Sequence, residues 1–206
     1  TNMRVSLEKN LVVLFCLVLF ALGATEWLSV RVVRELAQSQ RRVLHSQEVR
    51  ETLWQVLSMM QDAETGQRGF LLTGQESYLE PYRRARTQSP GMTKQLGVLV
   101  ANDPDHQKPF IRLQQLISQK WSVLSEALRA RRAHGLLAAQ NVVLSARGKH
   151  TMDSIRRVVA QMQSTEGARL EERSRELQAS EAQAHETLRV KSQLAPLAFA
   201  LFCWQV

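Results

Sequence analysis

The sequence predicts an all-α fold, an up-down-up-down antiparallel four-helix bundle flanked by transmembrane helices. Leu, Ala, Gln, Glu and Arg dominate the 206 residues, whereas there are only 9 glycines and 5 prolines, and this composition favours long helices. The sequence lacks the runs of alternating β-branched residues that would indicate strands. Both ends are apolar, and the long polar middle carries apolar residues at helical spacing.

The first element is a hydrophobic segment near the N-terminus. Residues 11–24 contain no charged side chain, and extension to Leu28 gives about 18 residues, near the lower limit for a helix that crosses ~30 Å of hydrocarbon. Trp27 lies where an interfacial aromatic residue is expected. We predict a cytoplasmic N-terminus at residues 1–10 and a transmembrane helix at residues 11–31. A cleaved signal peptide ending at Ala24 is the alternative.

The first bundle helix is expected to continue from the membrane to about Thr73 and to end at Gly74, a typical helix-terminating residue. Its apolar positions alternate spacings of four and three, as in helices of left-handed bundles. The stripe consists of Val49, Leu53, Val56, Met60, Ala63, Gln67 and Phe70.

Helix breakers divide the rest of the middle. Residues 102–104 (Asn-Asp-Pro) separate the second helix from the third, because Asp is a good N-cap and Pro suits a first helical turn. Gly135, with Gly148 further on, is expected to interrupt the chain before the fourth helix. Residues 73–76 (Thr-Gly-Gln-Glu) resemble a capping box. Divided equally, about 160 residues give four helices of about 40 residues each.

The third and fourth helices have apolar stripes of their own. The third carries Phe110, Leu113, Leu116 or Ile117, Trp121, Leu124 and Leu128. The fourth carries Met152, Ile155, Val159, Met162, Leu170, Leu177, Ala184 and Leu188.

The C-terminal segment is apolar and uncharged from Leu194 to Val206, about 13 residues, which is too short to span a bilayer. We interpret residues 193–206 as the start of a second transmembrane helix, truncated here. Two spans would place residues 32–192, the four-helix sensor domain, on one side of the membrane and both termini on the other.

Charge and composition exclude several classes of protein. The net charge is +8 and the pI about 10.2, but the arginines alternate with glutamates along helices, which is typical of a solvated face and not of a nucleic-acid partner. Both cysteines lie in the hydrophobic ends, and the five histidines lack metal-ligand spacing. We find no catalytic arrangement or phosphate-binding loop, and we expect no cofactor, no metal and no enzymatic activity in this chain.

One stretch is more specific than a generic helix. Residues 62–74 read DAETGQRGFLLTG and are followed by YLEPY at residues 78–82. This pattern resembles the signature of the third CHASE-type family of extracellular sensory domains. A second block, Gly148–Asp153 with Ile155-Arg156 and Glu166, is similar to the start of the family's last helix. Where an acidic pair is expected in that helix, this chain has Thr165-Glu166.

The motif residues divide into two groups. The candidates for ligand binding or signalling are Asp62, Glu64, Thr65, Gln67, Arg68 and Glu166. The residues assigned to the structural motif are Gly66, Gly69, Phe70, Gly74, Tyr78, Pro81, Tyr82 and Trp121. Gln67 lies on the apolar stripe, so it belongs either to a polar layer that switches between packings or to one that fixes helix register.

Two arginine clusters also leave two interpretations open. Arg83, Arg84 and Arg86 form one cluster, and Arg129, Arg131 and Arg132 form the other. Each is either a solvated helix face, the interpretation we favour, or a surface that binds an anion or lipid headgroups.

The resemblance implies the input module of a bacterial transmembrane receptor, located in the inner membrane with its sensor domain in the periplasm or outside the cell. The expected partners are the lipid bilayer, a second copy in a homodimer, and a periplasmic stimulus or ligand that the sequence does not identify. We favour a two-component sensor histidine kinase. The alternatives are a methyl-accepting chemotaxis-type receptor, a diguanylate cyclase and a structural helical spacer.

Overall fold

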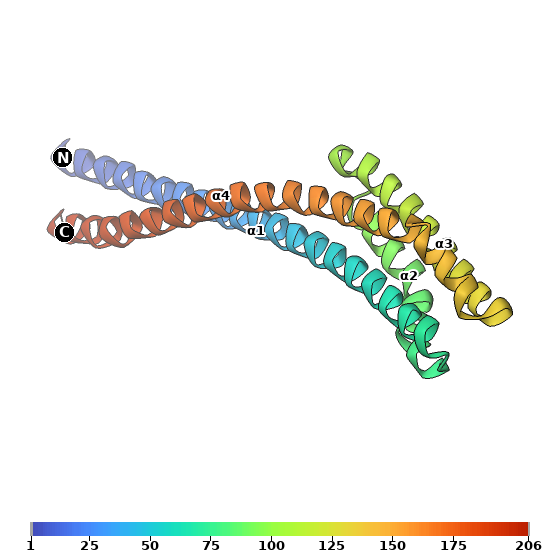
Figure 1. Ribbon diagram of the computed structural model, residues 1–206. Coiled ribbons are helices and arrows are strands. Elements are labelled where there is room, and N and C mark those ends of the chain that lie inside the picture. Colours follow the sequence, from blue (N-terminus) through green and yellow to red (C-terminus); the bar gives the residue numbers. More distant parts are fainter. Residues whose placement is uncertain (1, 206) are drawn as a thin grey trace. The chain divides into compact units, whose positions relative to one another are not determined.

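The computed structural model describes the backbone of residues 2–205 and the side chains of residues 15–189, except those of 17, 18, 21, 184, 187 and 188. Within residues 2–205 the chain forms four α-helices and one short 3-10 helix, and no strand (Figure 1). In chain order the elements are α1 (Asn2–Thr73), η1 (Glu76–Leu79), α2 (Glu80–Leu99), α3 (Pro104–Leu144) and α4 (Arg147–Gln205). The all-α prediction is confirmed.

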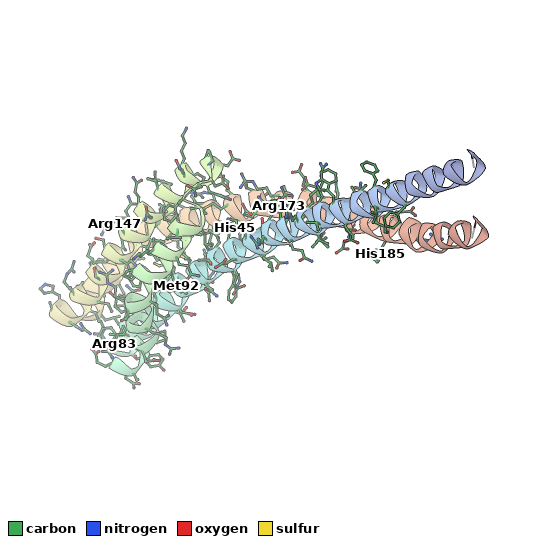
Figure 2. All side chains as sticks on the ribbon, turned by 180° about the vertical axis from the view of Figure 1, so that it is seen from behind. His45, Arg83, Met92, Arg147, Arg173 and His185 are labelled. Atoms are coloured by element: carbon green, nitrogen blue, oxygen red, sulfur yellow. The ribbon has the colours of Figure 1, made fainter. Side chains whose placement is uncertain are left out.

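The described chain divides into two compact units, to which α1 and α4 each contribute a segment. Unit 1 comprises residues 1–43 and 171–206, and unit 2 comprises residues 44–170. Figure 2 shows the side chains, with Arg83, Met92 and Arg147 labelled on unit 2 and Arg173 and His185 on unit 1.

Unit 2 is a four-helix bundle. Short connections join its consecutive helices, so each helix runs back along the one before it. The core takes residues from all four helices, and Met92 of α2 packs against it (Figure 2). The buried members are Val49, Leu53, Val56, Met59, Met60 and Ala63 of α1, Ala85 and Leu96 of α2 with Val100 just beyond, Leu113, Leu116, Ile117, Trp121 and Leu124 of α3, and Met152, Ile155, Val159 and Met162 of α4.

The predicted stripes account for most of this core. All seven stripe positions of the first helix are buried, including Gln67. Those of the third helix are buried except Phe110, which is half-buried. In α4 burial is complete only as far as Met162, because Leu170 and Leu177 are half-buried. The side chains of Ala184 and Leu188 lie outside the described residues.

Two helix boundaries lie where the sequence predicts them. Helix α1 ends at Thr73, and Gly74 follows with φ +73° and donates its N–H to the carbonyl of Phe70, an αL helix end that glycine favours. Helix α3 begins after Asp103, whose carboxylate accepts from the N–H of Asp105.

Three expectations about the helices are wrong. Helix α2 has 20 residues and not about 40, because only residues 75–101 lie between the breakers at Gly74 and Asn102, whereas α3 has the expected length with 41 residues. Gly135 interrupts the helical geometry inside α3 with φ +83°, as expected, but the chain turns at Ser145-Ala146 and Gly148 lies inside α4. The capping box is absent, since η1 starts after Gln75 without a side-chain cap.

Unit 1 pairs the first part of α1 with the last part of α4. The guanidinium of Arg173 donates to the carbonyl of Arg42 at 3.1 Å, and Arg42 forms an ion pair with Glu176 at 3.6 Å. These contacts are exposed, so each stabilises the pair by about 1 kcal/mol or less.

Much of the two hydrophobic segments, at residues 11–31 and 193–206, lies outside the residues whose side chains are described. Among the described residues, no helix holds a stretch both long and apolar enough to cross a membrane. The flanking transmembrane helices stay a prediction from the sequence.

Candidate functional site

The bundle contains two buried polar layers. The first, which we call the lysine layer, consists of Glu64 and Arg68 on α1, Lys120 on α3 and the carbonyl of Gly148 on α4. Lys120 is fully buried, and its ammonium donates to Glu64 Oε2 and to the Gly148 carbonyl, both at 2.9 Å. Arg68 donates to the other oxygen of Glu64 at 2.6 Å. One carboxylate thus joins a buried cation to an exposed one.

Burial lowers the pKa of Lys120 below its ordinary value, and the hydrogen bond that its ammonium donates to Glu64 acts in the opposite direction. Desolvation is the larger of the two effects because the whole side chain lies inside the bundle. Glu64 is therefore the counter-ion that offsets the cost of burying a charged lysine in the core.

Gln67 lies one helical turn from Glu64 and extends the polar contacts. Its side-chain amide donates to the backbone carbonyl of Leu124 on α3 at 3.2 Å. This bond satisfies a buried amide, which would otherwise be destabilising. It also ties the axial position of α1 to that of α3, so the structure contains the register-fixing contact that one interpretation of Gln67 requires.

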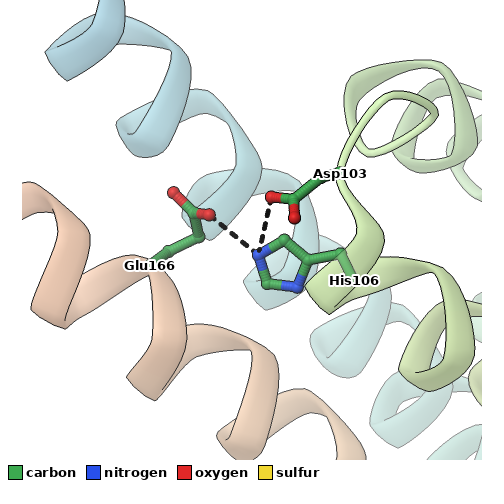
Figure 3. A group of neighbouring side chains, drawn as sticks. All are labelled: Asp103, His106 and Glu166. Carbon is green, nitrogen blue, oxygen red and sulfur yellow. Dashed lines mark hydrogen bonds and ion pairs between the residues drawn. The ribbon is translucent and has the colours of Figure 1, made fainter.

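The second layer, the histidine layer, consists of Ser46, Asp103, His106, Glu166 and Arg169. Glu166 on α4 is 2% exposed and accepts from the Ser46 hydroxyl on α1 at 2.5 Å. It also accepts from His106 Nε2 on α3 at 2.8 Å (Figure 3). His106 Nε2 also lies 3.9 Å from Asp103. This single carboxylate therefore links three of the four helices.

Arg169 completes the histidine layer from α4. Its guanidinium bonds to both oxygens of Asp103, to Asp105 at 2.5 Å and to Glu166 Oε1 at 3.0 Å. The same arginine thereby connects α4 to the N-cap that starts α3. Charge-assisted contacts of this kind are stronger than neutral hydrogen bonds.

These contacts set the charge of the layer. The hydrogen bond from Arg169 holds the pKa of Asp103 below its ordinary value. Burial alone would raise the pKa of Glu166, but hydrogen bonds from Ser46, His106 and Arg169 outweigh it and the pKa is lowered. Glu166 is consequently ionised at neutral pH and accepts only, so His106 Nε2 is the donor. His106 Nδ1 is buried and has no hydrogen-bond partner among the described residues.

The histidine layer also brings together three groups that bind metals in other proteins. Asp103, His106 and Glu166 each offer one ligand atom, and these atoms lie within 4.8 Å of one another. However, Arg169 already contacts both carboxylates with one nitrogen, so a metal ion would have to displace the guanidinium from each. The geometry favours an ion-pair layer over a metal centre.

The remaining sequence candidates do not converge on one pocket. Asp62 and Thr65 are exposed on α1, away from the two layers' buried atoms. Glu166 belongs to the histidine layer, whereas Glu64 and Arg68 belong to the lysine layer. The structural candidates lie mainly where α1 meets η1 and α2, and Phe70 joins a smaller core cluster with Leu71, Leu79, Ala127, Leu128 and Ala139.

Gly66 and Gly69 let η1 and the start of α2 approach α1 closely. A Cβ atom on Gly66 would lie 2.8 Å from the carbonyl oxygen of Tyr78 and 3.3 Å from Cβ of Pro81. A Cβ atom on Gly69 would lie 2.6 Å from the ring of Tyr78. Helix α1 continues unbroken through both positions, so these glycines serve close packing and not a bend. Tyr82 then contacts Trp121 edge-to-face, with ring centroids 5.5 Å apart.

Gly66→Ala is expected to lower the free energy of unfolding by about 1–3 kcal/mol, because the new methyl group meets backbone that cannot easily move. Gly91→Ala is the matched control, since no atom lies within 4 Å of its Cβ position. That change is expected to be neutral or to stabilise by up to about 1 kcal/mol through helix propensity. Urea denaturation measures both, and equal effects would contradict the close-packing role of Gly66.

Sequence reasoning missed five members of the layers: Ser46, His106, Lys120, Arg169 and Asp103, which was predicted only as a helix cap. Ser46, His106 and Lys120 continue apolar stripes, which is a usable signal, and His106 precedes Phe110 by four. Lys120 falls between Ile117 and Leu124 at spacings of three and four, and Ser46 precedes Val49 by three. A polar residue at a stripe position must find a buried partner, but the sequence does not say which.

Comparison with known proteins identifies the class of this fold. Residues 39–176, well over half of the chain, match the CHASE3 domain, an extracellular sensory domain. The chain therefore belongs to the CHASE3 domain family, as the motif at residues 62–74 indicated.

A solved structure has the same fold. The sensor domain of histidine kinase HK9 from Rhodopseudomonas palustris matches with a TM-score of 0.57 and 23% sequence identity, over 61% of this chain and 98% of that chain. A comparison with curated proteins gave no match. Together the family match and the fold define a sensor input module.

Proposed function

We propose that this chain is the extracytoplasmic input module of a bacterial two-component sensor histidine kinase, anchored in the cytoplasmic membrane by two transmembrane helices and acting as a homodimer. The CHASE3 match carries this proposal. The structural relative is itself named as a histidine kinase sensor domain, which supports this type of output over others. The chain itself has no enzymatic role and serves to convey a stimulus.

The two polar layers support a mechanism by helix displacement. Glu166 bonds α4 to α1 and α3, and Glu64 bonds α1 to α3 through Lys120. A small axial shift of one helix would leave buried charges unpaired. The bundle is therefore expected to move between a few discrete packings in which the buried charges are paired, and not through a continuous range of helix positions. A ligand that binds one packing better than another shifts the population between them. Helices α1 and α4 lead to the two hydrophobic ends of the chain and would carry the shift.

Phosphorylation of the native full-length protein tests the proposed output. Membranes that contain it are incubated with radiolabelled ATP, and bound label is tested for acid lability and alkali stability. We expect label with this behaviour, which is the chemistry of phosphohistidine. Absence of label from folded protein would contradict the kinase and favour the chemotaxis-type receptor or the diguanylate cyclase as the output.

A further inference from the structure

A groove between α2 and α3 lies outside both polar layers. It has a volume of about 760 Å³, within the range of small-molecule sites. The α2 side is formed by Arg86, Ser89, Pro90, Thr93 and Lys94, and the α3 side by Gln114, Ile117, Ser118, Trp121, Ser122 and Ser125. Two residues of this set are cationic, six bear a hydroxyl or amide group, and none is acidic.

The two cations of the groove differ from their neighbours in having no anionic partner. Arg83 pairs with Glu76 and Arg84 pairs with Glu80, whereas no carboxylate of the described residues pairs with Arg86 or Lys94. The side chain of Lys94 is exposed. An unpaired lysine on a surface is ordinary, but two unpaired cations at one groove produce a positive potential there.

The Arg86 guanidinium lies over the ring of Trp121. Its guanidinium carbon lies 5.0 Å from the centroid of the Trp121 ring, and Trp121 Nε1 donates to the Ser89 hydroxyl at 3.1 Å, which fixes the indole. A cation over an aromatic ring is attracted to it without using its N–H donors in hydrogen bonds. Arg86 forms no hydrogen bond or ion pair with another described residue, so its donors can bind a carboxylate with two parallel hydrogen bonds.

The spacing of the cations indicates the shape of a ligand. Arg86 and Lys94 are eight residues apart on one face of α2, or about 12 Å along the helix axis. The hydroxyl and amide groups of Gln114, Ser118 and Ser122 line the opposite wall between them. Pro90, Ile117 and Trp121 supply the apolar part of the lining, although Ile117 and Trp121 are only 5% and 6% exposed.

We propose that this groove binds a small linear dicarboxylate, with one carboxylate on the Arg86 guanidinium and the other on the Lys94 ammonium. The polar wall of α3 hydrogen-bonds the portion of the ligand between them. The role of this ligand as the stimulus of the receptor rests on the proposed function. Its binding to the groove does not depend on which output the receptor drives.

Adipate is the probe, and NMR of the full chain in detergent micelles is the measurement. The indole N–H signal of Trp121 is assigned with Trp121→Phe and followed during titration. We expect a saturable shift of this signal, while that of Trp54, which lies on α1 away from the groove, stays in place. Hexanoate, with one carboxylate, is expected to bind about fivefold more weakly, and 1,6-hexanediol more weakly again.

Three variants test the assignment of the two carboxylates. Arg86→Gln and Lys94→Gln are each expected to weaken adipate binding about fivefold, so that adipate binds no better than hexanoate. Arg84→Gln is the matched control because Arg84 pairs with Glu80 outside the groove, and it should leave adipate binding unchanged. Unfolding midpoints of all three verify that the bundle is intact. Three results would each overturn the proposal: no saturable shift with adipate, an affinity for 1,6-hexanediol equal to that for adipate, or a loss of adipate affinity in Arg84→Gln equal to that in the groove variants. None of these results would affect phosphorylation of the full-length receptor, which tests the proposed function separately.

Discussion

Replacing Glu64 with methionine is expected to lower the free energy of unfolding by about 3–5 kcal/mol, because removal of one partner leaves a buried charge without its counter-ion. The charge in question is the Lys120 ammonium, whose side chain is 1% exposed. Only the Gly148 carbonyl would still accept from it. Chemical denaturation of the wild type and the variant at neutral pH measures the difference.

A second substitution separates the ion pair from simple packing. In the Glu64→Met/Lys120→Met double variant both charges are gone, so most of the lost stability should return. Glu48→Met, at an exposed glutamate on the same helix, is the control and should change stability by no more than about 0.5 kcal/mol. A double variant less stable than Glu64→Met alone would contradict the assigned pairing.

Arg169→Met is expected to have the other large effect, a loss of about 3 kcal/mol at neutral pH. It removes the cation that bonds Asp103 and the buried Glu166 together. Arg156→Met is the matched control on α4, because its ion pair with Asp153 is half exposed and contributes about 1 kcal/mol or less. Thermal and chemical unfolding report both.

The pH dependence of stability provides a separate test of the histidine layer. The pKa values of Asp103 and Glu166 are lowered on folding from ordinary values of 3.8 and 4.5. A carboxyl group of this kind stabilises the fold above its unfolded pKa, and the contribution is lost as the pH falls through its folded pKa. The wild type should therefore lose stability as the pH falls below about 4.5. Arg169→Met should lose less over that range, and parallel profiles would contradict the role assigned to Arg169.

The sequence was sufficient to predict the bundle because its signals are local. The stripe from Val49 to Phe70 gives the buried face of α1, Gly74 ends that helix, and Asp103-Pro104 starts the third. The length of α2 was predicted wrongly because the residues were divided equally among four helices, although the breakers at Gly74 and Asn102 leave only residues 75–101 for the second helix.

The polar layers could not be predicted from local sequence patterns, for a different reason. Their members come from distant parts of the chain, as with Ser46 and Glu166, which are 120 residues apart. The spacing of Lys120 on its stripe indicates burial, but only the packed bundle shows that Glu64 is the partner. The close approach at Gly66 likewise depends on how η1 folds back, which glycine spacing alone does not specify.

A further substitution of Glu64 distinguishes a signalling role from a structural one. Glu64→Gln keeps the size of the side chain and an acceptor for Lys120 but removes the charge. In the full-length receptor, altered output at unchanged expression would support a role in switching. Reduced stability with unchanged output would assign the lysine layer to helix register, as the spacer alternative predicts.

Site-directed labelling of intact cells tests the central claim, an extracytoplasmic input module between two spans, most directly. Cys16 and Cys203 are replaced by serine, and a single cysteine is introduced at the exposed Ser77 in one variant and at Ser6 in another. A maleimide that enters the periplasm but does not cross the cytoplasmic membrane is added before lysis. The account predicts labelling of the cysteine at position 77 in intact cells and of the cysteine at position 6 only after lysis. Labelling of position 77 only after lysis would place the bundle in the cytoplasm and contradict the account.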